Sequence, residues 1–464
     1  MLFCRFASTA SRRLRPTISQ LLAQEPDPQV ILSVTGHIKS VRKQKRVTFA
    51  AVSDGSCPDG LQAVLSPDDA HTLTNGCSVR LTGRLVQSQG KGQAKELQVD
   101  KCEVIGTCDP EIYPIQKQVL STEYLRDHVH LRLRVDSIAS MLRVRQCAVD
   151  AIHDYFRREG FTHVHTPIIT GNDCEGAGET FRLSPVAHRA GSSLPPTEFF
   201  DRTAYLTVSS QLHLEAFAHA ISRVYTLSPC FRAERSQTNR HLSEFWMLEA
   251  EWGFVDRVGD ICDIVEDSIK HILNHPGLVG DLDVLWSNGD AERKQGVLEA
   301  KGMTPWARMS YTEAVKELEK VKSKFESEPI WGKPLKSEHE RWLADQVVKG
   351  PVFVTDYPSV LKPFYMRAND DGKTVACFDL LMPHLGELVG GSLREERVDL
   401  LDKAIEHHGL NKRDYSWYRD LRMYGGAPHG GYGLGFERLI GWMTGIENVR
   451  ECIPIPRWAG KLLL

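Results

Sequence analysis

The feature that most restricts the possible folds is a series of five short, alternating apolar segments between residues 30 and 106. They are separated by turn residues such as Asp54-Gly55 and Asn75-Gly76, and they read VILSVTGHIKSV, RVTFAAVSDG, LQAVLS, SVRLTGRLVQS and KELQVDKCEVIG. A period of two is typical of strands that bury one face. Five such strands within about 75 residues predict a small closed β-barrel of the OB type, a fold that binds oligonucleotides.

One part of this predicted barrel suits single-stranded nucleic acid. The net charge of −3 argues against a general nucleic-acid coat, so contacts must come from local patches. Five basic residues and no acid lie between Lys39 and Arg46, and Phe49 and Gln62 follow on the next two segments. Aromatic side chains stack on unpaired bases, and an amide can read a base edge. We predict nucleic-acid contacts from Arg42, Phe49 and Gln62, although a phenylalanine on a barrel strand is more often a core residue.

The apolar period changes at residue 136 and indicates a second domain. A helix from Asp136 or Ser137 to Gly160 is predicted there, followed by a strand in which Pro167 favours a sheet edge. The remaining chain mixes strands and helices without regular βαβ alternation, which predicts an α+β domain with a mainly antiparallel sheet flanked by helices. We assign 26–106 to the barrel, 107–135 to a hinge and 136–464 to the second domain, with a helical insertion at about 290–350.

Residues 1–25 differ in composition from the rest of the chain. Arg5, Arg12, Arg13 and Arg15 occur there with several Ser and Thr, and no acid precedes Glu25. Such N-termini are typical of mitochondrial presequences, so we predict import into the mitochondrial matrix, with a disordered basic tail as the alternative. No apolar run approaches the about 20 residues that cross a bilayer, so we predict no membrane segment. The 11 cysteines contain no CxxC pair and indicate reduced thiols.

A loop that is dense in charge follows Phe231 and lies between two strand-like runs. The run VYTLSPCF precedes the loop, and the run FWMLEAEW follows it. The loop carries Arg232, Glu234, Arg240 and His241. Charges on an isolated hairpin usually form a solvated face. The alternative is a nucleotide site, because arginine pairs bidentately with phosphate and a carboxylate accepts hydrogen bonds from an exocyclic amine.

Two further motifs suit a nucleotide. GGYGLGFERLIGWMTG places several glycines ahead of an apolar helix that carries Arg438, and an arginine there can hold a terminal phosphate. In FDLLMPHLGELVGGSLREER, Asp379 and Glu387 flank a turn and can meet on paired strands to hold Mg²⁺. Each motif alone is ambiguous, since the glycines could form a packing turn and the two acids could be unrelated.

Together these motifs resemble those of the class II aminoacyl-tRNA synthetases. The segment ending at Pro167 resembles the first motif of the family, residues 231–234 with the following loop the second, and residues 433–438 the third. A barrel ahead of such a core resembles the aspartyl, asparaginyl and lysyl branch. TPIITGNDCEGAGETF, YPSVLKPFYMRAND and GELVGGSLREER are most similar to the asparaginyl enzymes, here of a mitochondrial type. The resemblance runs from about residue 30 to the end.

The resemblance implies that ATP, asparagine and tRNA(Asn) are substrates, that Mg²⁺ is held by Asp379 and Glu387, and that the protein is a homodimer. Arg232 would contact the α-phosphate and Arg438 the γ-phosphate, and these two are the implied catalytic residues. Glu234 would hold the adenine amine, His241 the outer phosphates and Phe245 the adenine ring. The implied ATP-binding set is Arg232, Glu234, Arg240, His241, Phe245, Gly433, Gly435 and Arg438, and the implied anticodon set is Arg42, Phe49 and Gln62.

The resemblance also implies an amino-acid pocket of Glu175, Ser209, Gln211, Glu249 and Arg394. Leu214 lies where the aspartyl relatives carry a lysine for the substrate carboxylate, which favours asparagine. Glu249 stands where those relatives carry aspartate; its carboxylate would accept from the substrate amide and repel an aspartate side chain. Glu251 is close enough in sequence to be confused with Glu249.

We therefore expect ligation of asparagine to its tRNA through asparaginyl-adenylate, with release of pyrophosphate and AMP, for mitochondrial translation. The alternatives are an aspartyl-tRNA synthetase, including one that charges both tRNAs, an ammonia-dependent asparagine synthetase, and a synthetase-like RNA-binding protein. Leu214 argues against the first and the barrel against the second. Arg232, Glu234 and Arg438 occurring together with the acid pair argue against the third.

Overall fold

The computed structural model describes residues 14–88, 90, 93–116, 118–172, 174, 179–184, 198–287 and 289–464. The polypeptide divides into two compact units, Met1–Ser140 and Met141–Leu464. Among the described residues, no helix combines the length and the apolar character that a bilayer span requires. Every cysteine within them is a free thiol.

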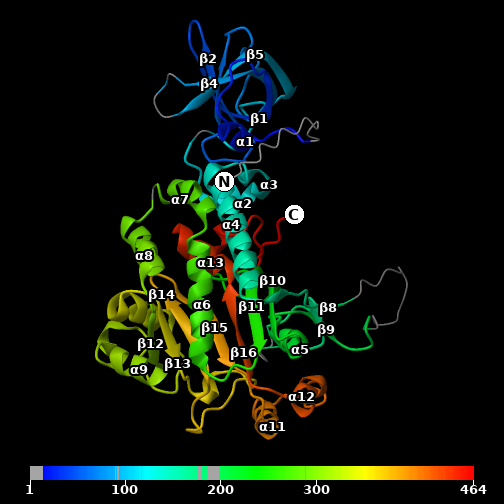
Figure 1. Ribbon diagram of the computed structural model, residues 1–464, viewed down its shortest axis with the longest axis vertical. Helices are drawn as coiled ribbons and strands as arrows, with labels where there is room; N and C mark the ends of the chain where they lie inside the picture. Colours follow the sequence, from blue (N-terminus) through cyan, green and yellow to red (C-terminus); the bar gives the residue numbers. More distant parts are fainter. Residues whose placement is uncertain are drawn as a thin grey trace, which may run out of the picture. The chain divides into compact units, whose positions relative to one another are not determined.

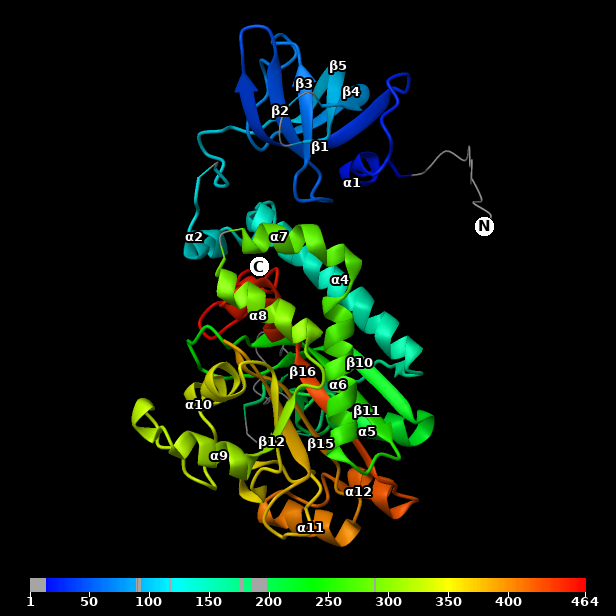
Figure 2. The ribbon, with the colours of Figure 1, turned by 60° about the vertical axis from the view of Figure 1, so that its left-hand side comes forward.

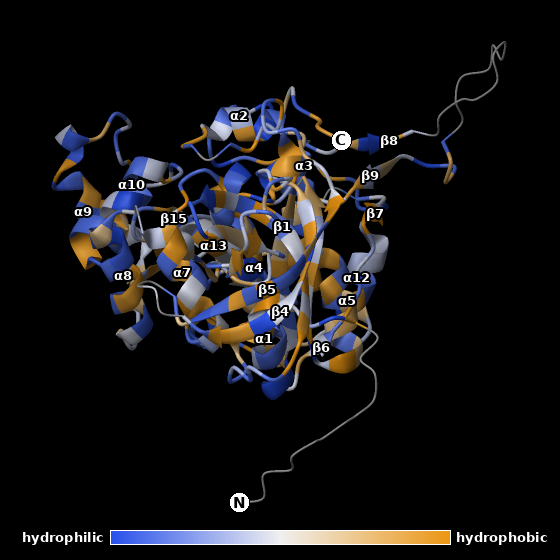
Figure 3. Ribbon diagram, turned by 90° about the horizontal axis from the view of Figure 1, so that it is seen from above, coloured by the Kyte–Doolittle hydropathy of each residue, from blue (hydrophilic) through white to orange (hydrophobic). Residues whose placement is uncertain are grey.

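The first unit contains a closed barrel in the order β1-β2-β3-β5-β4, blue in Figure 1, so the predicted OB-type barrel is confirmed. Its strands are β1 (Leu32–Lys43), β2 (Thr48–Ser53), β3 (Leu61–Leu65), β4 (Ser78–Gln87) and β5 (Lys95–Gly106). Alternate residues fill the interior, where Ala50 and Val52 are fully buried. Figure 3 shows hydrophilic and hydrophobic residues mixed along β4 and β5, as expected for strands with one buried face.

Helix α1 (Ile18–Leu22) is part of this barrel. Thr17 and Gln20 form a capping box at its start, and Ile18 and Leu21 are each 1% exposed within the barrel core. The Ile18 N–H donates to Asp54 at 2.8 Å, and Lys95 donates to the α1 carbonyl of Leu22 at 2.6 Å. The predicted presequence 1–25 therefore overlaps residues that complete the barrel, while its first 13 residues lie outside the described range.

The segment 107–135 is more ordered than the hinge that we predicted. It contains α2 (Thr122–Asp127) and α3 (Val129–Arg132). The Ser121 hydroxyl caps α2 by accepting the Tyr124 N–H, and Leu125 and Val129 are buried. One cap and two apolar side chains are too few to produce a helical period in the sequence.

The second unit is built on an eight-stranded sheet with the order β12-β13-β14-β15-β16-β11-β10-β6 (Figures 1 and 2). All neighbouring strands are antiparallel except the pairs β12–β13 and β10–β6, so the predicted mainly antiparallel α+β fold is confirmed. The strands are β6 (Thr162–His163), β10 (Arg223–Phe231), β11 (Glu244–Gly253), β12 (Ala307–Ser310), β13 (Val352–Thr355), β14 (Cys377–Met382), β15 (Gly386–Leu393) and β16 (His429–Gly435). A small sheet is formed by β7 (Ile169–Thr170), β9 (Ala204–Leu206) and β8 (Arg182–Leu183).

Helices cover this sheet. The helix α6 (Val258–Leu273) crosses one face in both Figure 1 and Figure 2 and buries Ile261, Val265 and Ile269. The other helices are α4 (Asp136–Arg158), α5 (Gln211–Ile221), α7 (Val279–Trp286), α8 (Ala291–Gly302), α9 (Tyr311–Glu319), α10 (Ser337–Trp342), α11 (Val398–His407), α12 (Ser416–Met423) and α13 (Phe436–Thr444). Single turns occur at Pro276–Leu278, Lys322–Lys324, Ser359–Leu361 and Val449–Glu451, and a π-helical segment at Leu343–Val348.

The expected helical insertion at about 290–350 is only partly helical. It contains α8, α9 and α10, but β12 lies between α8 and α9 and pairs in parallel with β13 as an edge strand of the main sheet. A four-residue strand with no fully buried residue shows no clear alternation in sequence. The segment is therefore joined to the sheet that carries the site.

Candidate active site

The charged segment that begins at Phe231 forms the predicted antiparallel hairpin. Strands β10 and β11 pair in a register that sets Cys230 opposite Phe245 and Phe231 opposite Glu244. The neighbouring strand β16 contains the glycines of the third motif, which lie within a strand rather than a turn. At Gly431 a Cβ would stand 2.1 Å from the Ala250 carbonyl oxygen, so a side chain there would separate β16 from β11.

The hairpin, β16 and α13 enclose a cavity of about 180 Å³. Every residue of the predicted ATP-binding set lines it, namely Arg232, Glu234, Arg240, His241, Phe245, Gly433, Gly435 and Arg438. The cavity therefore brings together side chains from two distant segments of the sequence, and these side chains can bind phosphate, an aromatic ring and an amine.

The charges around this cavity pair with one another. The Arg232 guanidinium lies 5.4 Å from the Phe245 ring centre and 3.9 Å from Glu234, whose other carboxylate oxygen is 2.9 Å from His241 Nε2. Arg438 donates to the main-chain carbonyl of Glu387 at 3.1 Å. Hydrogen bonds of this kind can be exchanged for bonds to a charged ligand at modest net cost.

A second cavity of about 200 Å³ shares Arg232, Met247, Glu387 and Gly433 with the first. Four of the predicted amino-acid-binding residues line it, namely Ser209, Gln211, Glu249 and Arg394, together with Leu214. The fifth, Glu175, lies outside the described residues. The shared residues make the two cavities adjoining compartments, so a group bound in one can approach a group bound in the other.

Glu249 connects the cavity wall to the start of α5. It is 2% exposed, and its carboxylate accepts the Ser209 hydroxyl at 2.5 Å and the Ser210 N–H at 2.9 Å. A carboxylate at a helix N-terminus is electrostatically favourable. Glu249 thus holds Ser209 in place and also lines the cavity.

Arg394 and Glu251 form a buried bidentate ion pair on the cavity floor. Arg394 Nη2 lies 2.7 Å and Nε 3.1 Å from the two Glu251 oxygens, and the side chains are 3% and 1% exposed. Burial raises the pKa of Glu251, and Arg394 opposes that shift. Glu251, which the sequence did not separate clearly from Glu249, is therefore the residue that orients Arg394.

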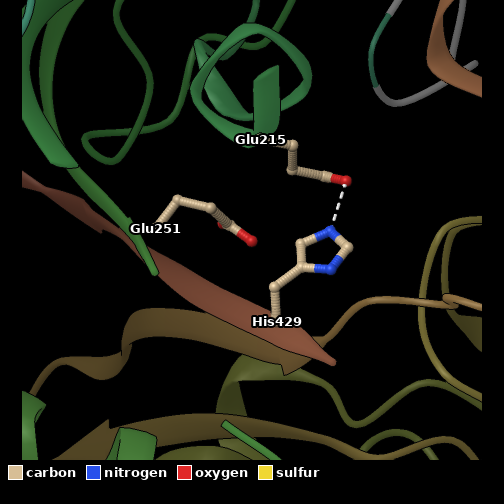
Figure 4. A group of neighbouring side chains, drawn as sticks. All are labelled: Glu215, Glu251 and His429. Atoms are coloured by element: carbon tan, nitrogen blue, oxygen red, sulfur yellow. Dashed lines mark hydrogen bonds and ion pairs between the residues drawn. The ribbon is translucent and has the colours of Figure 1, made fainter. Parts of the chain in front are cut away.

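A polar network centred on Glu215 of α5 lies next to this pair. The Glu215 carboxylate accepts from Arg422 at 2.6 Å and Tyr418 at 2.8 Å, and it lies 3.0 Å from His429 Nε2 (Figure 4). Burial would raise the pKa of Glu215, but Arg422 and His429 hold it well below its usual range. Glu215, Glu251 and His429 have the spacing of metal ligands. Because guanidinium groups already pair with both carboxylates, we interpret the cluster as a structural charge network.

Asp379 and Glu387, the predicted metal ligands, face a common point between β14 and β15. A Cβ on Gly390 would stand 3.6 Å from an Asp379 oxygen and 3.5 Å from a Glu387 oxygen, so the missing side chain leaves space beside both. Two carboxylates that face one space suit Mg²⁺. A third acid, Glu340 of α10, accepts the Glu387 N–H at 3.3 Å. Burial, together with Glu387 and Asp379, raises the pKa of Glu340 to about 7.

Residues 121–459 match the family described as tRNA synthetases class II (D, K and N), and residues 32–105 match the OB-fold nucleic acid binding domain. The chain belongs to the class II tRNA synthetases of the aspartyl, lysyl and asparaginyl branch. The asparagine–tRNA ligase of Myxococcus xanthus is 45% identical, over 96% of this chain and 98% of the relative. That of Pseudoalteromonas translucida is also 45% identical, with the same coverage.

Solved structures give the same result for this class II synthetase. Asparaginyl-tRNA synthetase from Pyrococcus horikoshii, complexed with asparaginyl-adenylate, is 28% identical with a TM-score of 0.85 and covers 97% of this chain and 100% of that one. The Entamoeba histolytica asparaginyl enzyme in complex with the same adenylate is 29% identical with a TM-score of 0.80, over 93% and 96% of the two chains. The predicted class II synthetase with an N-terminal OB barrel is thereby confirmed, whereas the mitochondrial subtype stays a prediction.

Several residues of this synthetase site were not predicted from the sequence. Lys362 lies in the second cavity and pairs with Asp379, and Glu340 comes from the segment that we expected to be peripheral. Glu215 and His429 form the network beneath Arg394. Lys362 stands in the motif YPSVLKPFYMRAND, which we compared with asparaginyl enzymes, so a sequence signal for it existed. Glu340 had no such signal, because it lies on a short helix with charged neighbours.

Proposed function

We propose that this class II synthetase ligates asparagine to its cognate tRNA in mitochondria. The observation that carries the proposal is the pair of adjoining cavities, one lined by the whole predicted ATP set and the other by Ser209, Gln211, Glu249 and Arg394. Two relatives that are 45% identical to this chain are asparagine–tRNA ligases, which supports the choice of amino acid.

In the first step the asparagine α-carboxylate attacks the α-phosphorus of ATP. The bond from that phosphorus to the bridging oxygen breaks, pyrophosphate leaves, and asparaginyl-adenylate remains. Arg232 holds the α-phosphate and Arg438 the γ-phosphate, while Phe245 stacks on adenine, so positioning and charge neutralisation supply most of the rate. Asp379 and Glu387 would hold Mg²⁺, which would neutralise phosphate charge.

The second cavity selects asparagine over aspartate by its charges. Leu214, which is 1% exposed, contributes an apolar wall where the aspartyl relatives carry a cation. Arg394 donates to the side-chain oxygen and Glu249 accepts from the amide nitrogen, with Ser209 and Gln211 near the α-amino group. A carboxylate in place of the amide would face Glu249 unpaired, which is costly in a buried site.

In the second step the terminal ribose hydroxyl of the tRNA attacks the adenylate carbonyl, and AMP leaves. The barrel binds the anticodon through Arg42, Phe49 and Gln62. Arg42 lies beside Phe49 on the paired strand, with its guanidinium 5.0 Å from the ring centre, and Gln62 is on β3. We further propose that two chains dimerise through the first motif, at the sheet edge formed by β6.

Aminoacylation of tRNA(Asn) with asparagine tests this function, and a barrel variant tests the role of the first unit. Phe49→Ala is expected to raise the KM for tRNA about tenfold, because stacking on one base contributes about 1–3 kcal/mol. ATP–pyrophosphate exchange should be unchanged, since it does not involve tRNA. Phe254→Ala, at an exposed phenylalanine of the second unit, is the control. An unchanged KM for Phe49→Ala would contradict anticodon binding by this face.

The mitochondrial location is tested at the N-terminus of the protein isolated from the organelle. We expect any presequence to be removed before Thr17, because α1 supplies two core residues of the barrel. Mass spectrometry of the N-terminal peptide should locate the mature start at or before residue 17. A mature start beyond residue 22 would contradict the role of α1, and recovery of the protein only outside the organelle would contradict the location.

A further inference from the structure

Lys362 and Asp379 form a tight ion pair beside the reacting groups. The Lys362 Nζ lies 2.7 Å from each oxygen of Asp379, and both side chains are 15% exposed. Burial would lower the pKa of Lys362, but Asp379 raises it above its usual value, so the ammonium group stays charged. The same Nζ lies 4.0 Å from the Tyr357 ring centre, which also favours a cation.

Lys362 belongs to the amino-acid compartment alone. It lines the cavity that contains Ser209, Gln211 and Arg394, and it is not part of the wall of the cavity that contains His241 and Arg438. The charged group of asparagine that reacts is its α-carboxylate, which must lie between the two compartments. Lys362 is therefore placed to meet the amino acid rather than the outer phosphates.

Asp379 and Glu387 each have a protein cation nearby. Asp379 has Lys362 at 2.7 Å, and Glu387 has Arg438 at 3.9 Å. If Asp379 binds Mg²⁺, a divalent cation and an ammonium group would compete for one carboxylate, and their mutual repulsion is strong at such distances in a buried site. The flexible four-carbon stem of lysine allows Nζ to turn to another anion.

We propose that Lys362, which pairs with Asp379, is a substrate-binding residue that binds the α-carboxylate of the amino acid when Asp379 engages Mg²⁺. The inference rests on the proposed function for the identity of the amino acid. In this arrangement Lys362 neutralises the carboxylate of Asp379, a role that bound Mg²⁺ would take over. It also couples amino-acid binding to the metal through one side chain.

The test compares asparagine with asparaginol, in which the α-carboxylate is replaced by a hydroxymethyl group. Dissociation constants are measured by calorimetry with a non-hydrolysable ATP analogue, with and without Mg²⁺. In the unsubstituted protein with Mg²⁺, the dissociation constant of asparaginol should exceed that of asparagine about tenfold or more. The ratio of these two dissociation constants should decrease without Mg²⁺, because the hydrogen-bonded charge pair between Lys362 and the α-carboxylate is lost. In Lys362→Met the ratio should be several times smaller and independent of Mg²⁺.

Two further variants complete the experiment. Lys403→Met, at an exposed lysine of α11, should preserve both the ratio and its dependence on Mg²⁺. Lys362→Arg keeps the charge and should retain part of the ratio even if Lys362→Met folds poorly. The inference about Lys362 would be overturned, and the proposed function left standing, by an unchanged ratio of dissociation constants in Lys362→Met. An equal decrease of that ratio in Lys362→Arg and Lys362→Met would have the same meaning. Failure of the unsubstituted protein to bind asparagine would overturn the proposed function and this inference with it.

Discussion

Replacement of Arg438 by alanine is expected to lower the rate of asparagine-dependent ATP–pyrophosphate exchange by about 10²–10³-fold or more. Arg438 is the cation that α13 presents to the ATP cavity, where its one described hydrogen bond is to the main-chain carbonyl of Glu387. Without it, the charge that develops on the leaving pyrophosphate lacks a fixed partner. Binding of tRNA should be preserved, because the predicted anticodon contacts lie on the barrel.

Arg257→Ala is the matched control for this variant. Arg257 also pairs with an acid, Asp260 at 2.5 Å, but its side chain is 76% exposed and lines neither of the two cavities. Its loss should leave exchange unchanged. The exchange rate of Arg438→Lys should lie between the rates of Arg438→Ala and Arg257→Ala, since lysine keeps the charge but not the planar donor pair. Exchange that survives in Arg438→Ala would show that ATP is held elsewhere.

The largest expected effect on stability comes from Glu215→Ala. Glu215 and Arg422 are both fully buried, so removal of the carboxylate leaves a guanidinium without its counter-charge and His429 without its partner. Breaking a buried ion pair from one side costs about 3–5 kcal/mol. The free energy of unfolding, measured by urea denaturation, should fall by that amount. Glu447→Ala removes the exposed partner of Arg293 and should change the value by less than about 1 kcal/mol.

The same carboxylate should affect the pH dependence of stability. Because the pKa of Glu215 is lowered in the folded protein, its contribution is complete above its unfolded pKa of about 4.3 and declines as the pH falls toward the folded pKa. Glu215→Gln should therefore flatten the loss of unfolding free energy between about pH 5 and pH 3. Unfolding curves that lose stability equally steeply with and without Glu215 would show that the carboxylate is not ionised in the folded state.

The fold was predictable where local patterns are strong. The alternating strands of the barrel, the hairpin around Arg232 and the long helix α4 each carry a period or turn signal that their own residues supply. Residues whose structure depends on distant partners were predicted less well. The helix α1 is five residues long and is stabilised by Asp54 and the barrel core, and β12 is a strand only because β13 lies beside it.

The site shows the same limit. The predicted ATP-binding residues come from two motifs, and the structure places all of them around one cavity. The contacts that give Glu249 and Glu251 different roles were not visible in the sequence, because both lie on one face of β11 and differ only in what they meet. Glu249 meets the start of α5, whereas Glu251 meets Arg394. Glu340 was missed because its partner Glu387 is close in space and not in sequence, whereas Lys362 stands in a motif whose signal was not used.

The choice between asparagine and aspartate is the central claim, and ATP–pyrophosphate exchange tests it most directly. The protein without its first 13 residues, which keeps α1, is assayed with each amino acid over a wide concentration range. The charges of Glu249 and Arg394 and the apolar side chain of Leu214 predict a kcat/KM for asparagine about 10⁴-fold above that for aspartate. Equal or greater exchange with aspartate would contradict the account, because it would require a cation for the substrate side chain where the structure places Leu214.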